Sequence, residues 1–242
     1  MATFVLVHGA WHGSWCWKRV RRELQGQGHD VFTPTLTGLA DRSHLLSRQV
    51  TLETHILDIV NLIRWEELSD IVLCGHSYGG AVISGVADRM PDRIRALVYL
   101  DAFVLEDGEN VAQHVPEAQA NQLIDGATKV GEGWKVPPIP AEVFNVNGQD
   151  RDWVNRQCTM QPIETIQQRI SLAGNIKKIR NVTFILATGF VEGSPFPPFY
   201  EKAKAKGWNT VALTCGHEVM LDRPEELTRV LLDAFEAQPI VI

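Results

Sequence analysis

The residues best suited to chemistry lie in the pentapeptide Gly75-His76-Ser77-Tyr78-Gly79. It follows the apolar run 71–74 and opens a stretch of small residues that continues to position 87. A Gly-x-Ser-x-Gly sequence between a strand and a helix is typical of a sharp turn that exposes a nucleophilic serine. Glycine on each side leaves room for this turn, because bulky neighbours would clash there. Ser77 is therefore the predicted nucleophile.

Ser77 needs a general base, since a free serine hydroxyl is a poor nucleophile at neutral pH. In folds that use this turn, the catalytic residues follow one another along the chain as serine, acid and histidine. His217 lies in Cys215-Gly216-His217-Glu218, after the last strand-like run and before the last helix-like segment. The sequence therefore predicts that His217 takes the Ser77 proton and returns it to the leaving group.

Two carboxylates compete for the acid that orients His217. Glu192 lies in the segment 189–195, which matches a Gly-x-x-acid-x-x-Pro pattern after the penultimate strand. Asp101 ends an earlier strand-like run, 96–100. Either would accept the ring N–H of His217 and fix its tautomer. We predict Glu192, with Asp101 as the alternative acid and a serine–histidine dyad as a third option.

An oxyanion hole requires backbone N–H groups that approach the substrate carbonyl closely. The residue after the nucleophile and the loop after the first strand supply them in such folds, which here gives Tyr78 and Ala10. One such donor is worth about 3 kcal/mol in the transition state. Four aromatic residues are predicted to line a neutral pocket that suits a flat, uncharged group: Trp11, Phe103, Phe144 and Trp153.

Short apolar runs alternate with amphipathic stretches, a pattern that favours a mostly parallel sheet covered by helices on both faces. Predicted strands cover 3–7, 31–32, 70–75, 96–100, 182–187 and 210–213. Predicted helices cover 15–27, 51–67, the residues after Ser77 up to Met90, and 224–236, the last opened by Pro224.

The alternation fails between positions 103 and 181, where glycine and proline are frequent and a short helix is predicted over 163–172. Strand signals resume afterwards, so we interpret this stretch as a cap inserted into a single domain that covers 1–242.

Composition narrows the possible partners. The 242 residues are 45% hydrophobic and 21% charged, which is ordinary for a globular domain. The net charge of -6, with no basic run, argues against nucleic acid. Met1 directly precedes a strand-like run and no apolar run reaches about 18 residues, so we expect a cytoplasmic protein without a membrane span. The four cysteines lack paired spacing, so no metal is expected, and catalysis by Ser77 and His217 needs no cofactor. A small-molecule substrate is the expected partner, and the oligomeric state stays open.

With these motifs placed, the chain resembles the α/β-hydrolases over essentially its whole length. Segments 4–13 and 75–80 resemble the branch that contains plant methylesterases and hydroxynitrile lyases. The lyases carry threonine where Ala10 stands and lysine where Glu218 stands. The resemblance therefore implies an α/β-hydrolase fold and the esterase side of this branch.

Further segments resemble bacterial esterases that hydrolyse carbendazim, a heteroaryl methyl carbamate: 52–56, 97–103, 151–156 and 215–220. This resemblance implies a serine esterase that cleaves a small neutral ester or methyl carbamate through an acyl-enzyme on Ser77. Segment 107–140 of the predicted cap matches poorly, so a general carboxylesterase or methylesterase stays the alternative. Carbon–carbon cleavage of the lyase type, or a non-catalytic receptor, fits the motifs less well.

Overall fold

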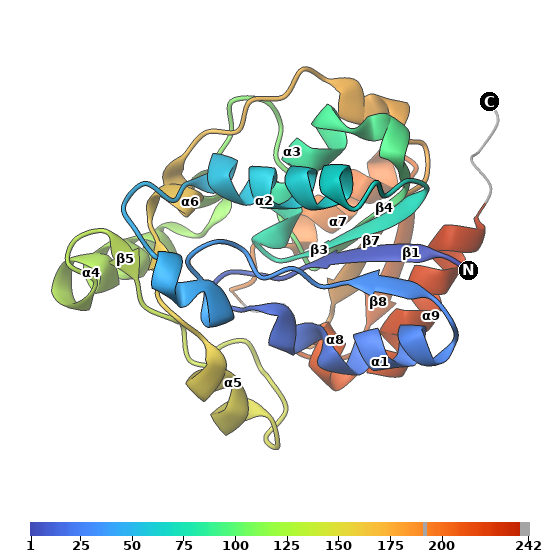
Figure 1. Cartoon of the computed structure of the whole chain (residues 1–242). Coiled ribbons are helices and arrows are strands. Elements are labelled where there is room, and N and C mark those ends of the chain that lie inside the picture. Colours follow the sequence, from blue (N-terminus) through green and yellow to red (C-terminus); the bar gives the residue numbers. More distant parts are fainter. Residues whose placement is uncertain (191–192, 238–242) are drawn as a thin grey trace.

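The computed structural model describes residues 1–190 and 193–237. Its main sheet has six parallel strands in the order β2-β1-β3-β4-β7-β8 (Figure 1). The strands are β1 Thr3–Val7, β2 Asp30–Phe32, β3 Ile71–His76, β4 Ile94–Leu100, β7 Val182–Ala187 and β8 Asn209–Leu213. The predicted strands and the parallel sheet are thus confirmed, with shifts of one or two residues at some ends.

Helices cover both faces of the sheet (Figure 1). On one face pack α1 (Lys18–Gly26), α8 (Val219–Asp222) and α9 (Pro224–Glu236), and on the other α2 (Leu52–Trp65), α3 (Gly79–Arg89) and α7 (Pro197–Ala205). Alternate residues of β1 serve the two cores: Phe4 and Leu6 face α1 and α9, whereas Val5 and Val7 face α2 and α3. Burying one such side chain stabilises the fold by about 1.5–3 kcal/mol.

Helix ends follow from local chemistry. The Thr51 hydroxyl accepts the backbone N–H of Thr54 and so starts α2. Pro224 occupies the first turn of α9, where its missing N–H costs nothing, and two glutamates there favour the positive end of the helix dipole. Short 3-10 helices complete the chain: Ser14–Trp17, Ala40–Leu45, Pro91–Arg93, Val111–His114 and Asn175–Lys178.

The chain between β4 and β7 leaves the sheet. It contains α4 (Glu117–Val130), α5 (Arg151–Gln157), α6 (Glu164–Gln167) and the antiparallel pair β5 (Lys135–Val136) and β6 (Gln161–Pro162). Its elements α4, β5 and α6 lie in the left-hand part of Figure 1. The division of the chain into one domain with a cap over 103–181 stays a prediction. No helix in the described residues is long and apolar enough to cross a membrane.

The predicted bounds of the helix over 163–172 are wrong, because the observed helix α6 ends at Gln167. Gln168 has an extended backbone, and its side chain accepts the N–H of Glu53. Ile170 then donates its N–H to the Glu109 carbonyl, so the segment is tied to other parts of the chain.

Gly79 offers a test of the packing beneath the Ser77 turn. A Cβ there would lie 2.7 Å from the His8 carbonyl oxygen and 2.8 Å from that of Val7. We expect Gly79→Ala to lower the free energy of unfolding by about 1–3 kcal/mol, because backbone atoms cannot move aside freely. Gly26→Ala is the matched control: nothing lies within 4 Å, and alanine in a helix should add about 0.5–1 kcal/mol. Urea unfolding measures both, and equal effects would contradict the packing argument.

Candidate active site

Ser77 lies on the predicted sharp turn between β3 and α3. Its φ is +53°, a left-handed conformation that non-glycine residues adopt at a cost of about 1–3 kcal/mol. The turn is held by two hydrogen bonds, from the Ser77 N–H to the Leu100 carbonyl (3.2 Å) and from the Gly80 N–H to the Ser77 carbonyl (3.0 Å). The side chain therefore stands at the carboxyl end of the sheet, where helix α3 begins.

His217 follows β8 and is bonded to Asp101. The distance from His217 Nδ1 to an Asp101 carboxylate oxygen is 2.7 Å, and the two residues are 2% and 0% exposed. The other Asp101 oxygen accepts the Ala187 N–H at 3.1 Å. Burial raises the pKa of Asp101, and the hydrogen bond from His217 acts against that rise. The bond leaves His217 Nε2 as the ring atom that is free to act as a base.

Glu192, the acid that the sequence favours, lies outside the described residues. The ring nitrogen that it was expected to bind is bonded to Asp101, the alternative acid. Asp101 directly follows β4, and His217 follows β8. Only β7 lies between these two parallel strands in the sheet, so both residues lie at the same edge.

An apolar cavity of about 60 Å³ opens over Ser77 and His217. Five of the predicted binding and oxyanion-hole residues line it: Ala10, Trp11, Tyr78, Phe103 and Phe144. Trp153 is not among the described residues that line this cavity, and its role in substrate binding stays a prediction. It lies on α5, where its ring packs edge-on against that of Trp15 with 5.0 Å between the ring centroids.

Three phenylalanine rings surround the His217 imidazole. Phe196 stacks on it with 5.1 Å between the ring centroids and an interplanar angle of 9°. The centroids of Phe190 and Phe144 lie 5.1 and 5.2 Å from that of the imidazole. These rings exclude water from the imidazole and limit its orientation. Phe190 and Phe196 were not predicted from the sequence, although Phe190 lies within the Gly-x-x-acid-x-x-Pro segment 189–195 and Phe196 directly follows it.

The loop after β1 brings the Ala10 amide to the cavity. Trp11 has a φ of +63°, and its N–H donates to the buried Gln161 side chain at 2.8 Å, which ties the loop to β6. Gly9 permits the close approach, since a Cβ there would lie 2.9 Å from His76 Nδ1. Among the described residues, the backbone N–H groups of Ala10 and Tyr78 donate to no protein acceptor. The Tyr78 hydroxyl, by contrast, is bonded to His55 Nδ1 at 2.9 Å.

Several buried histidines near the site are neutral. Burial lowers the pKa of His8 to about 3, and its Nε2 accepts the Leu36 N–H. Burial likewise lowers the pKa of His55 to about 4 and that of His76 well below its usual value. His76 Nε2 donates to the His217 carbonyl at 3.0 Å, which helps to fix the loop that carries His217.

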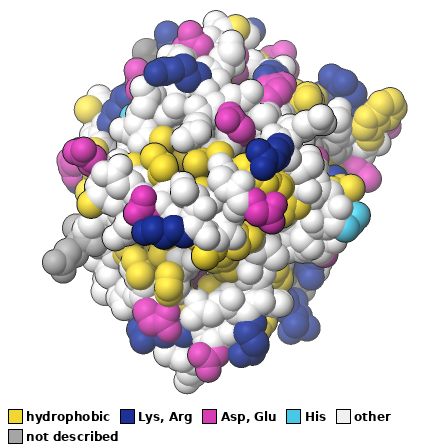
Figure 2. Space-filling view, turned by 90° about the vertical axis from the view of Figure 1, so that its left-hand side faces the viewer, with side chains coloured by type: hydrophobic (Ala, Val, Ile, Leu, Met, Phe, Trp, Pro, Cys, Tyr) yellow, Lys and Arg dark blue, Asp and Glu magenta, His cyan; other side chains and the backbone are white. Residues whose placement is uncertain are grey.

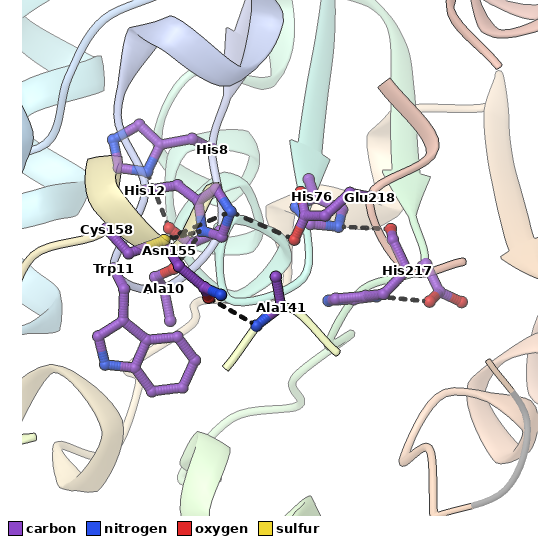
Figure 3. A network of polar contacts seen from close by, with 12 residues as sticks. His8, Ala10, Trp11, His12, His76, Ala141, Asn155, Cys158, His217 and Glu218 are labelled. Carbon is purple, nitrogen blue, oxygen red and sulfur yellow. Dashed lines mark hydrogen bonds and ion pairs between the residues drawn. The ribbon is translucent and has the colours of Figure 1, made fainter. Parts of the chain in front are cut away.

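His12 differs from these histidines because its partners favour the protonated ring (Figure 3). Its Nδ1 donates to the Ala10 carbonyl at 2.6 Å, and its Nε2 lies 3.3 Å from a carboxylate oxygen of Glu218, which is 1% exposed. Burial alone would lower the pKa of His12, but Cys158, Glu218 and the Ala10 carbonyl raise it to about 10. The imidazolium therefore holds the loop of the expected oxyanion hole.

His76, His217 and Glu218 each have one potential metal-ligand atom within 4.8 Å of the others. His217 Nδ1 is already bonded to Asp101, and the carboxylate charge of Glu218 is already matched by His12.

Neither Cys16 nor Cys215 is among the residues that line the cavities next to Ser77 in the described chain.

Comparison with known proteins identifies the family of the chain. The model of the alpha/beta hydrolase family matches residues 4–230. A carbendazim hydrolyzing esterase from Nocardioides sp. (strain SG-4G) is 47% identical over 239 residues, which cover 96% of this chain and 98% of that protein. Methylesterase 8 from Arabidopsis thaliana is 29% identical over 171 residues, covering 70% of this chain and 59% of the relative.

Solved structures show the same fold at lower identity. An extracellular alpha/beta-hydrolase from a Paenibacillus species has a TM-score of 0.84 at 23% identity, covering 97% of this chain and 99% of that chain. A pyrethroid hydrolase from Sphingobium faniae JZ-2 has a TM-score of 0.75 at 24% identity, covering 98% of each chain.

The chain belongs to the alpha/beta hydrolase family, as the sequence predicts, and is a hydrolase. The carbendazim hydrolyzing esterase and the methylesterase both support esterase activity.

The protonation of His12 can be tested by NMR. A pKa raised from 6.5 to about 10 means that the ring stays an imidazolium between pH 6 and 9, whereas His8 and His55 stay neutral. Because the pKa is raised on folding, the stabilisation from His12 is complete below pH 6.5 and is lost as the pH rises toward 10. Long-range ¹⁵N–¹H spectra of the imidazole rings distinguish the two forms. A neutral His12 at pH 7 would contradict the ion pair.

Proposed function

We propose that this protein is a serine esterase that hydrolyses small neutral esters or heteroaryl methyl carbamates through an acyl-enzyme on Ser77. The observation that carries the proposal is the buried hydrogen bond between His217 and Asp101, at the rim of an apolar cavity that Ser77 also lines. In this assignment Asp101 is the triad acid in place of Glu192.

In the acylation step, His217 Nε2 takes the proton of Ser77 as the hydroxyl oxygen attacks the substrate carbonyl. The Asp101 carboxylate holds the Nδ1–H tautomer and stabilises the imidazolium that forms. The N–H groups of Ala10 and Tyr78 bind the oxyanion, and their lack of protein acceptors in the described residues supports this role. The imidazolium then protonates the leaving group, and water hydrolyses the acyl-enzyme.

The aromatic and uncharged lining of the cavity favours a flat, neutral substrate. Its walls carry the aromatic rings of Trp11, Phe103, Phe144, Phe190 and Phe196, and no lysine, arginine, aspartate or glutamate is among its described lining residues. On the face of the molecule that carries α4, hydrophobic side chains gather in a central band with charged groups around it (Figure 2). The 47% identity to a carbendazim hydrolyzing esterase supports a heteroaryl carbamate as one such substrate.

A carbamate places a particular demand on this site, because its nitrogen lone pair makes the carbonyl less electrophilic. Cleavage then depends on a good leaving group, such as an aminobenzimidazole, and on a well-aligned oxyanion hole. The acyl group left on Ser77 would be a methyl carbonate, which water converts to methanol and carbon dioxide.

The substrate class is tested by kcat/KM of the purified protein on carbendazim beside p-nitrophenyl acetate and butyrate. We expect turnover of all three substrates, with a kcat/KM for carbendazim that is comparable to those for the simple esters. Inert carbamate with active esters would leave a general carboxylesterase, and no turnover of any would contradict the proposal.

Removal of the nucleophile or the base should abolish activity with little change in fold. We expect Ser77→Ala and His217→Ala each to lower kcat by about 10⁴-fold or more, since the two groups act as a unit. Labelling with a fluorophosphonate should occur on wild-type Ser77 only. Retained turnover in either variant would contradict the mechanism.

The triad acid is tested by a matched pair of isosteric variants. In Asp101→Asn, an amide N–H would face His217 Nδ1 and force the tautomer that cannot accept the Ser77 proton, so kcat should fall by about 10⁴-fold. The thermal midpoint should be kept, because the variant removes a buried carboxylate whose ionisation burial disfavours. Glu192→Gln should have a far smaller effect on kcat. The reverse order would assign the acid to Glu192, and two mild effects would favour a dyad.

A further inference from the structure

A second, much smaller cavity lies behind the oxyanion loop. Its volume is about 10 Å³, close to what one water molecule requires. The loop residues Gly9 to His12 line it together with His76 and Glu218. Ser77 and His217 line it as well, so it adjoins the carbonyl of any acyl group on Ser77.

Three buried acceptor atoms face this region without a hydrogen-bond partner. They are both carboxylate oxygens of Glu218 and Nδ1 of His76, and within residues 1–190 and 193–237 no protein group bonds to them. His76 donates from Nε2 to the His217 carbonyl, so its Nδ1 carries a lone pair. His76 and Glu218 are each 1% exposed, and buried polar atoms in native proteins are nearly always satisfied.

The charges around the cavity and its volume indicate which ligand could donate hydrogen bonds to these acceptor atoms. His12 lies 3.3 Å from Glu218, at ion-pair distance but without hydrogen-bond geometry, and matches the carboxylate charge. The cavity therefore calls for a neutral donor rather than a cation. Water is neutral, fits the volume and offers two O–H donors for acceptors on opposite residues.

We propose that His76 and Glu218 hold a water molecule that becomes the nucleophile in deacylation. The inference rests on the proposed acyl-enzyme at Ser77. One O–H stays on the Glu218 carboxylate, and the other turns from His76 Nδ1 to His217 Nε2 once the leaving group has departed. The water oxygen then attacks the acyl carbon as its proton passes to His217. The bond to Ser77 Oγ breaks, the oxygen recovers that proton from His217, and the free acid leaves.

Glu218 and His76 act in this scheme as positioning residues, so their loss should slow deacylation more than acylation. His76→Gln keeps an amide donor near the His217 carbonyl while removing the Nδ1 acceptor, and Glu218→Gln removes the carboxylate charge at equal size. With p-nitrophenyl acetate, we expect the deacylation rate constant to fall about 10²-fold in each variant and the acylation rate constant to fall much less, so that deacylation becomes rate-limiting. A burst of about one p-nitrophenol per enzyme and an acetylated Ser77 in the intact-mass spectrum should appear.

Thr228→Val is the matched control. Its hydroxyl is also buried without a partner in the described residues, but it lies on α9, away from the cavity. It should show the wild-type burst. Equal losses of acylation and deacylation in His76→Gln and Glu218→Gln, or an unchanged burst, would overturn the inference. Absence of acetylated Ser77 in the wild-type protein and in every variant would instead overturn the proposed function.

A crystal structure of the wild-type protein gives an independent test if these variants fold poorly. We expect one ordered water within about 3.2 Å of both His76 Nδ1 and a Glu218 oxygen. A metal ion at this place, or no density there, would overturn the inference.

Discussion

The hydrogen bond between Asp101 and His217 is the constraint on which the arrangement of the site depends. It joins residues 116 positions apart and is almost completely buried. A buried carboxylate without a partner would be strongly destabilising, so the fold must deliver the histidine to it. It does so by placing β4 beside β7 and by fixing the His217 N–H on the Phe144 carbonyl at 2.9 Å.

The same end of the sheet concentrates backbone strain. Trp11, Ser77 and Asp101 follow β1, β3 and β4, three adjacent strands, and each has a positive φ. None is glycine, so each residue adopts a conformation that costs about 1–3 kcal/mol. The surrounding core over-determines these turns, because β1 and β3 are buried between two layers of helices. The strain directs the Ser77 and Asp101 side chains and the oxyanion loop toward one point.

The sequence predicted those parts whose signal is local. Strand and helix periodicity located the sheet, and the Gly-x-Ser-x-Gly turn with the order of the motifs led to Ser77 and His217. The bond of Asp101 is not local: a carboxylate after a buried strand looks the same whether it meets a histidine or backbone amides. Helix α4 was missed because only Ala127 is buried on it, so no apolar stripe marks it. The position of Trp153 could not be predicted either, because an aromatic residue in the predicted cap carries no sign of which side it packs against.

The charges near His217 form a consistent set. Asp101 and Glu218 are two carboxylates in a poorly hydrated region, and the charge of Glu218 adds to the rise in the pKa of Asp101. His12 offsets that effect, because its imidazolium pairs with the Glu218 carboxylate. The Asp101 carboxylate is then available to accept the N–H of His217. Transfer of the Ser77 proton to His217 then creates one positive and one negative charge, so the total charge of the site does not change during acylation. Acylation therefore needs no bulk solvent to stabilise charge, since each new charge forms beside an existing partner: the imidazolium beside Asp101 and the oxyanion beside backbone N–H groups.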